Sequence, residues 1–358
     1  MLNPNRKFLV GIIVAVIVSA AVSSAVTTYY IQNMTVKPVA STRTVMKITN
    51  YVGGITTPAA AVYAADVEGF YLQNGISLSY VILSGTSAAV QAAAADRTGY
   101  AFTQGDIIDM VLLEAANPGQ VNLLAIALLE RVNPVTVVFL KSSGIMKPTD
   151  LKGKTVGVPF GSLSAKLFPA FAKATGLDPN SVNLQNIDFS ALHPALLAKK
   201  VDAVIEFSRG VASATIEANK MKDDVGYFSF GDYGIPPQMG AIVVQKGLVQ
   251  NHPEIARAIV NATLWGYYFA IHNPEAAIKD FLSMNPGRDY DQTLAEWKFN
   301  LKTNVGIEST ANLKPLQMGW FDTALVSKTV DLTRSQFDVK AQIDPNSLFT
   351  NQFVEKPP

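Results

Sequence analysis

"NIDFSALHPALLAKKVDAVIEF", residues 186–207, is the stretch that decides the fold. It begins as a strand, continues as a short helix with Pro194 near its head, and ends as a second strand that closes on Glu206 and Phe207. A strand, a helix and another strand in so few residues form a βαβ step, which joins parallel strands of one sheet. The stretch therefore predicts an α/β protein.

The same alternation runs through most of the chain. Strand-like segments lie at residues 45–52, 76–83, 100–104, 121–128, 154–159, 182–188, 202–207, 226–230 and 240–249. Helical patterns fill the intervals, and one of them, at residues 58–75, opens at Pro58 and closes at Gly75. Beyond residue 253 the pattern is mostly helical. This rhythm predicts two sheets of the parallel type, each covered by helices on both faces.

Length and composition limit the class of protein. A chain of 358 residues is longer than one hydrophobic core supports, so two lobes are expected. With 49% hydrophobic residues, 16% charged residues and a net charge of +1, the chain is typical of a packed globular protein and lacks the basic stripe of a nucleic-acid-binding protein. It has no cysteine, which excludes disulfides, thiolate metal sites and a lipid-carrying cysteine. Its three histidines show no metal-binding spacing and are interpreted as surface or capping residues.

The N-terminal segment predicts export. Arg6 and Lys7 precede the uncharged residues 8–30, which as a helix would cross a hydrocarbon layer about 30 Å thick. The alternative is a cleaved signal peptide with a small-residue cleavage site at residues 23–25. Both interpretations place the rest of the chain outside the cytoplasm, either anchored to the membrane by one transmembrane helix or released.

The order of the elements predicts one lobe inserted into another. The expected segments are an anchor or signal peptide at 1–34, a linker at 35–45, lobe 1 at 46–140, lobe 2 at 141–238, the completion of lobe 1 by helices at 239–345, and a tail at 346–358. The chain would cross between the lobes near Leu140 and near Gly240. Two lobes joined by two crossings form a hinge, and ligands of open α/β sheets bind at the carboxyl ends of the strands. The sequence therefore predicts one cleft between the lobes.

Several stretches carry a family resemblance. "GFYLQNGISLSYVILSGTSAAVQAAAADRTGYAFTQGD" (69–106), "SSGIMKPTDLKGKTVGVPFGSLSAKLFPAFAKATGLDPNSV" (142–182) and "DYGIPPQMGAIVV" (232–244) resemble the solute-binding proteins of ABC importers. Within that superfamily they are most similar to the group that serves nitrate, sulfonates such as taurine, and the pyrimidine precursor of thiamine. The resemblance covers residues 47–284 and implies a two-lobed fold of the periplasmic-binding-protein type. It also implies a monomer without cofactor or catalytic residues, whose partners are a small ligand and a membrane permease.

Two strand-to-helix turns suggest ligand contacts. Each has a glycine followed by hydroxyl residues that begin a helix, where free backbone N–H groups and the helix dipole favour an oxyanion. The residues are Gly85, Thr86 and Ser87 in lobe 1 and Gly161, Ser162 and Ser164 in lobe 2. The alternative is that these hydroxyls only cap their helices.

Further candidates stand at strand ends and near the second crossing. They are Thr56, Thr57, Gln104, Glu206, Asp232 and Tyr233. The alternatives are a capping role for Thr57, a solvated strand end for Glu206, and simple turn formation around Tyr233. Carboxylates in the cleft would repel a purely anionic ligand and favour one with an amine or N–H donors, such as an aminopyrimidine or an aminosulfonate. Arg209 weakens this argument because it could pair with Glu206.

An enzyme on the same scaffold is the alternative function. Thiamine-pyrimidine synthases resemble these binding proteins, but their chemistry relies on a cysteine-rich iron motif that a chain without cysteine lacks. The sequence also shows no nucleophile elbow and no phosphate-binding loop. A solute-binding protein is therefore the expected function.

Overall fold

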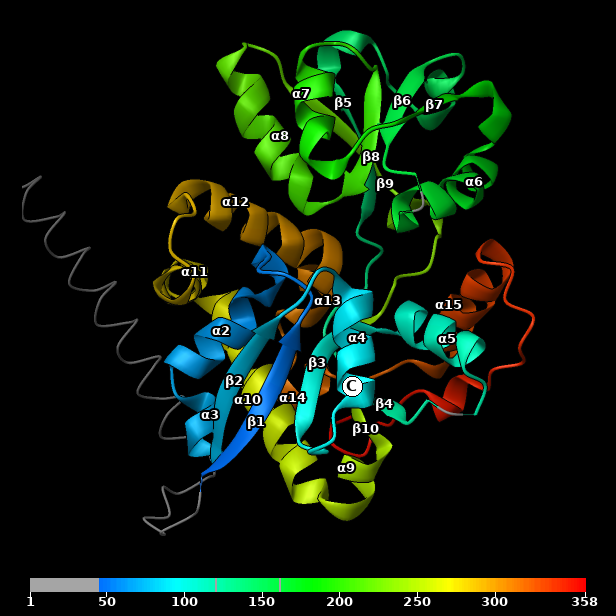
Figure 1. The fold of residues 1–358 in the computed structure, drawn as a ribbon. Coiled ribbons are helices and arrows are strands. Elements are labelled where there is room, and N and C mark those ends of the chain that lie inside the picture. Colours follow the sequence, from blue (N-terminus) through cyan, green and yellow to red (C-terminus); the bar gives the residue numbers. More distant parts are fainter. Residues whose placement is uncertain (1–44, 120, 161) are drawn as a thin grey trace, which may run out of the picture. The chain divides into compact units, whose positions relative to one another are not determined.

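Two separate β-sheets organise the structure. The computed structural model describes residues 45–119, 121–160 and 162–358, so the predicted membrane segment at 8–30 lies outside the described residues. Within those ranges no helix is long and apolar enough to cross a membrane. Each sheet has five strands, and we call the sheet that contains the first strand, with its helices, lobe 1 and the other lobe 2 (Figure 1).

The sheet of lobe 1 has the strand order β2-β1-β3-β10-β4. Its strands are β1 (Met46–Val52), β2 (Ile76–Ile82), β3 (Ala101–Asp106), β4 (Leu123–Leu128) and β10 (Gly240–Gln245). Strand β1 runs parallel to β2 and β3, as the βαβ pattern predicts. Strand β10 runs antiparallel to both β3 and β4 because it returns from lobe 2 and enters the sheet from the end where β3 stops. The prediction of a parallel sheet is therefore wrong, and the sheet is mixed.

The sheet of lobe 2 has the order β7-β6-β8-β5-β9. Its strands are β5 (Val135–Leu140), β6 (Thr155–Val158), β7 (Asn183–Asn186), β8 (Ala203–Phe207) and β9 (Val225–Ser229). Strand β5 is antiparallel to β8 and β9, so this sheet is mixed as well. Because β5 already belongs to lobe 2, the first crossing precedes Val135 and does not lie near Leu140.

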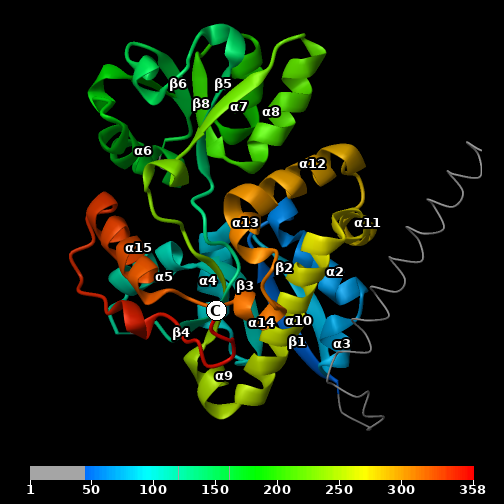
Figure 2. The same ribbon diagram turned by 180° about the vertical axis from the view of Figure 1, so that it is seen from behind.

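Helices surround both sheets (Figures 1 and 2). They are α2 (Ala60–Val67), α3 (Phe70–Gln73), α4 (Thr86–Ala95), α5 (Ile107–Ala116), α6 (Leu163–Thr175), α7 (Leu192–Leu197), α8 (Arg209–Lys220), α9 (Lys246–Asn251), α10 (Pro253–His272), α11 (Pro274–Met284), α12 (Tyr290–Asn300), α13 (Ile307–Thr310), α14 (Pro315–Met318) and α15 (Thr323–Gln336). The single helix expected at 58–75 is divided between α2 and α3, because Gly69 has a left-handed backbone with φ of 75°.

Each lobe has its own hydrophobic core. In lobe 2 the rings of Phe171 and Phe230 stack with their centroids 4.3 Å apart, and both side chains are fully buried. In lobe 1 the buried side chains of β10 and β4 pack with Ile107 and Phe321. Two independent cores explain why a cleft can lie between the lobes.

The C-terminal helices do more than complete lobe 1. Helix α12 packs against both α11 and α8, and α15 packs against both α5 and α6, so each of these helices contacts both lobes (Figure 1). The predicted tail is also ordered into the fold. Phe349 forms a parallel bridge with Ala125 on β4, where the backbone amide of Ala125 donates to Leu348 and that of Thr350 donates to Ala125.

Candidate functional site

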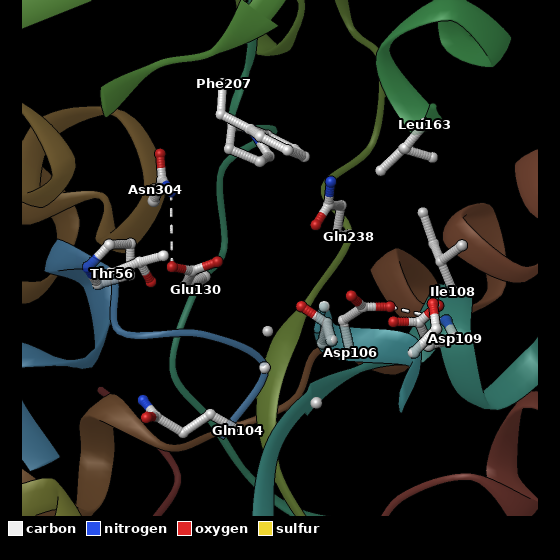
Figure 3. Close-up of a pocket in the computed structure, with 18 of the residues that line it drawn as sticks. Thr56, Gln104, Asp106, Ile108, Asp109, Glu130, Leu163, Phe207, Gln238 and Asn304 are labelled. Carbon is white, nitrogen blue, oxygen red and sulfur yellow. Dashed lines mark hydrogen bonds between the residues drawn. The ribbon is translucent and has the colours of Figure 1, made fainter. Parts of the chain in front are cut away.

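A cavity of about 510 Å³ lies between the two lobes, and residues of both lobes line it. Its lining includes the carboxyl ends of β1, β3 and β8 and the start of β10. This is the predicted position at the carboxyl ends of the parallel strands. Figure 3 shows how the labelled side chains are arranged around it.

Five predicted residues line the cavity from lobe 1. They are Thr56, Gly85, Thr86, Ser87 and Gln104. Gly85 stands just before α4 with φ of 100°, a left-handed conformation that favours glycine. Gly53 packs so closely on this turn that an added Cβ would lie 2.7 Å from the backbone of Thr86. The glycine at position 53 is therefore what allows the two cavity-lining turns to meet.

Two carboxylates at the start of α5, Asp106 and Asp109, lie near the start of α4. The hydroxyl of Ser87 donates to Oδ1 of Asp109 at 2.5 Å, and Oδ1 of Asp106 accepts from the backbone N–H of Asp109 at 2.7 Å. Asp106 is thus the N-cap of α5, and it also lines the cavity. An oxyanion placed at the N-terminus of α4 would lie beside these acidic groups, which repel it when they are ionised.

The acidic groups of the cavity are shifted toward their neutral forms. Burial raises the pKa of the Asp106 carboxyl well above its usual range, and the nearby charge of Asp109 raises it further. Burial also raises the pKa of Asp109 and of Glu130, although the hydrogen bond from Asn304 and the charge of Arg209 oppose the shift of Glu130. The cavity therefore offers hydrogen-bond acceptors and can hold a proton on its acidic side.

Glu130 connects the cavity to both lobes. Its Oε1 accepts from the Nδ2 of Asn304 at 3.5 Å (Figure 3). The Oδ1 of Asn304 accepts from the hydroxyl of Ser208 in lobe 2 at 2.6 Å. Asn304 lies in a short π-helix, Leu301–Val305, that follows α12. Such local widening of a helix often places side chains at functional sites.

Gln238 supplies an unused hydrogen-bond donor. Its side chain lines the cavity and is only 9% exposed, yet its amide nitrogen has no partner among the described residues. Gln104, on β3, donates to the hydroxyl of Tyr267 at 3.2 Å. A buried amide without a partner is costly, so a ligand that accepts from Gln238 would remove that cost.

Lobe 2 contributes an aromatic and basic wall. Phe207 lines the cavity (Figure 3). The guanidinium of Arg209 lies over its ring with 4.9 Å to the centroid. The ammonium of Lys166 lies 4.3 Å from the ring centroid of Phe337, and both also line the cavity. Lobe 2 can therefore cover a ligand ring while lobe 1 bonds its polar edge.

Three predicted residues lie outside the cavity lining and have other partners. Thr57 is buried and donates to Glu296 at 2.5 Å. Glu206 accepts from His193 at 2.8 Å, so His193 is neither a simple surface residue nor a cap. Tyr233 packs its ring edge on Phe171 within the core of lobe 2.

The lobe 2 turn does not mirror the lobe 1 turn. Ser162 caps α6 by accepting from the backbone N–H of Ala165 at 3.2 Å, which is the alternative considered from the sequence. Ser164 is fully buried, and its hydroxyl has no partner among the described residues. Neither lines the cavity, and Asp232 is exposed outside it. Gly161 lies outside the described residues.

Sequence reasoning missed several lining residues. They are Asp109, Glu130, Arg209, Gln238, Tyr267, Asn304 and Phe337. Most of them lie in the segments that cross between the lobes or in helices far along the chain. No sequence motif marks these positions. The one available signal was for Gln238, because it stands two residues before the strand that returns to lobe 1.

Comparison with known proteins identifies the family. The NMT1/THI5-like family model matches residues 56–277, which is more than half of the chain. A formylaminopyrimidine-binding protein of Halalkalibacterium halodurans is 24% identical over 223 residues, covering 62% of this chain and 65% of that relative, so the match spans just under two thirds of the relative's length. The riboflavin-binding protein RibY of Chloroflexus aurantiacus is 24% identical, and the match covers 82% of each chain.

Solved structures share the fold. A putative periplasmic sulfonate-binding protein of Methylobacillus flagellatus matches with a TM-score of 0.64 at 17% identity, over 87% of this chain and 93% of that one. The desulfurization enzyme DSZB matches with a TM-score of 0.57 at 15% identity, over 86% and 97%. The fold is thus the two-lobed fold of periplasmic binding proteins, and it is also found in an enzyme. With the family model, these likenesses confirm the resemblance drawn from the sequence: the chain belongs to the NMT1/THI5-like family.

Proposed function

We propose that the protein is an extracytoplasmic solute-binding protein of an ABC importer, and that it captures a small polar organic solute in the cavity between its lobes. The observation that carries this proposal is the cavity itself, since polar groups of lobe 1 and an aromatic wall of lobe 2 surround one space of ligand size. Two relatives whose names state that they bind a formylaminopyrimidine or riboflavin support it. The partners would be the ligand and a membrane permease, and the protein would act as a monomer without a cofactor.

The cavity favours a ligand rich in N–H donors. Asp106, Asp109 and Glu130 all line it. Of its basic lining residues, Arg209 lies over the ring of Phe207, and Lys166 is exposed and lies over the ring of Phe337. An alkanesulfonate or nitrate at α4 would meet the acidic side chains there, and a ligand with an amine would bond them. Gln238 could donate to a ring nitrogen, and Phe207 could stack on an aromatic ring. An aminopyrimidine-like solute therefore fits better than a simple sulfonate.

The predicted ligand residues divide into two groups. Thr56, Gly85, Thr86, Ser87 and Gln104 remain in the proposed site with the lining residues named above. Thr57, Ser162, Ser164, Glu206, Asp232 and Tyr233 are not carried into it, because they do not line the cavity. Gly161 lies outside the described residues, and its part in the site stays a prediction. The proposed location outside the cytoplasm, with the N-terminal segment as anchor or signal peptide, is inferred from the sequence.

A ligand panel tests this function. The protein is heated with an aminopyrimidine, formylaminopyrimidine, riboflavin, taurine, an alkanesulfonate or nitrate, and unfolding is followed. A ligand at about a hundredfold its dissociation constant stabilises by about 2.7 kcal/mol. Stabilisation by nitrogen heterocycles supports the proposal, and stabilisation only by alkanesulfonates or nitrate contradicts the ligand class. Conversion of a panel compound without a partner would instead favour an enzyme on this scaffold.

Variants connect the ligand to the cavity. Glu130→Gln should weaken binding of an amine-bearing ligand about tenfold to a hundredfold, because a charge-assisted hydrogen bond contributes about 1.5–3 kcal/mol. Asp232→Asn is a matched control, since it also replaces a carboxylate by an amide but at an exposed position outside the cavity. Calorimetric titration measures both, and equal affinities in the two variants would remove Glu130 from the site.

A further inference from the structure

Glu296, on α12, bonds both lobes with one carboxylate. Its Oε2 accepts from the hydroxyl of Thr57 in lobe 1 at 2.5 Å, and its Oε1 accepts from the hydroxyl of Ser213 on α8 in lobe 2 at 2.7 Å. Gln292 and Arg288 add donors at 3.1 and 3.4 Å. The residue is only 6% exposed, so these bonds are shielded from water.

Each bonded segment continues directly into the cavity wall. Thr57 follows Thr56, and Ser213 stands one helical turn after Arg209, and both neighbours line the cavity. Moving Glu296 would therefore move a lining residue in each lobe. Glu296 does not itself line the cavity, so its influence on a ligand must pass through these two segments.

The same side of the C-terminal segment carries a second link. Residues 296, 300 and 304 are spaced by four, and Asn304 bonds Ser208 of lobe 2 as well as Glu130 in the cavity. Between these two links, Asn300 is fully buried, and neither atom of its amide has a partner among the described residues. An unpaired amide at this position is poised to gain a bond in a different arrangement of the lobes.

We propose that Glu296 is a positioning residue for ligand binding, which ties the Thr56–Thr57 turn of lobe 1 to α8 of lobe 2 and so sets the arrangement of the lobes that the ligand meets. A carboxylate suits this role because its two oxygens accept from opposite sides at once. A glutamine would keep the size of the side chain but replace one of the two acceptors by a donor. This inference rests on the proposed function only where a ligand is used as the readout.

The test measures the distance between the lobes directly. The chain has no cysteine, so cysteines introduced at Leu72 of lobe 1 and Met146 of lobe 2 provide two unique sites for spin labels. These side chains are 61% and 83% exposed. Glu296→Gln is compared with Glu275→Gln, a matched control that removes the exposed ion pair between Glu275 and Lys298 of the same helix α12.

We expect Glu296→Gln to shift or broaden the distance distribution of the ligand-free protein and Glu275→Gln to leave it unchanged. Titration with 4-amino-2-methylpyrimidine should show at least a fivefold change in dissociation constant for Glu296→Gln alone. If no panel compound binds, the proposed function fails, but the ligand-free distances still decide the role of Glu296. A lower melting temperature with unchanged distances and affinity would overturn the inference, because a merely structural residue behaves in that way.

Ser213→Ala provides a milder second variant, since it removes only the donor from lobe 2. It should reproduce the distance change in the same direction, and combining it with Glu296→Gln should add little, because both changes break one contact. Additive effects of the two changes, or an unchanged distance in Ser213→Ala, would contradict a tie between Thr57 and α8 through Glu296.

Discussion

Replacing Glu206 by glutamine separates support of lobe 2 from binding of a ligand. The carboxylate of Glu206 accepts from His193 at 2.8 Å, and an added Cβ at Gly210 would lie 1.8 Å from its Oε2. The side chain is therefore wedged between α7 and the start of α8. It is buried and lies outside the cavity lining, so its loss should weaken the fold and leave binding intact.

The magnitude follows from the contact with His193. Burial alone lowers the pKa of His193, but the hydrogen bond and charge of Glu206, with the charges of Glu217 and Glu296, outweigh it and raise the pKa. Weakening a charge-assisted hydrogen bond costs about 1.5–3 kcal/mol. For a folded unit of this size, that cost corresponds to a drop in melting temperature on the order of 3 °C.

The pH dependence gives a sharper test. Because the pKa of His193 is raised in the folded protein, its contribution to stability is fully present below the ordinary histidine value of about 6.5 and is lost as the pH rises through the raised pKa. Urea denaturation from about pH 5.5 to 8.5 should show this decline in the native protein. In Glu206→Gln the decline should flatten.

Glu217→Gln serves as the control. Glu217 approaches His193 at 3.6 Å, but its side chain is 41% exposed, so its loss should cost less than about 1 kcal/mol. The reasoning is refuted if Glu206→Gln loses ligand affinity while its stability and pH profile stay native. That result would place Glu206 in the binding site.

Two further stability predictions concern lobe 2. Phe171→Ala should lower the free energy of unfolding by about 3–5 kcal/mol in urea denaturation, because it removes one ring of the buried stacked pair. Phe189→Ala, at a half-exposed ring, should lower it by less than about 1 kcal/mol. Similar losses in the two variants would contradict this packing. Gly226→Ala should destabilise by about 1–3 kcal/mol, since its Cβ would lie 2.3 Å from the ring of Phe139. In Gly247→Ala the added Cβ would meet the Nδ2 of Asn251 at 3.9 Å, an ordinary contact distance, so this variant should be neutral or slightly stabilising. A native melting temperature for Gly226→Ala would show that the ring yields easily.

The sequence predicted the elements better than their directions. Strands were found because alternation and glycine or proline punctuation are local signals. The antiparallel direction of β10 and β5 could not be predicted, because a strand that returns from another lobe has the same pattern as one that follows a helix. The break at Gly69 was missed because a single glycine inside a helical pattern is also tolerated without a break.

The site shows the same division between local and distant signals. The turn at residues 85–87 was found from a strand, a glycine and hydroxyls in succession. The position of Glu206 at the end of its strand predicts a cleft residue, but its neighbour Phe207 lines the cavity instead. Successive side chains of a strand point to opposite faces, so an error of one residue places the prediction on the wrong face. Val204, on the same face as Glu206, packs in the cluster that contains Leu192 of α7. Asn304 was beyond prediction because only the folded chain brings it to Glu130.

The bridge between Phe349 and Ala125 has a practical consequence. It occupies the outer side of β4, which would otherwise expose free backbone groups as a template for another molecule. Removing the residues from 347 onward would therefore leave β4 as an exposed edge strand and promote aggregation during purification. Affinity tags are better placed where residues 348–350 and their bonds to β4 stay intact.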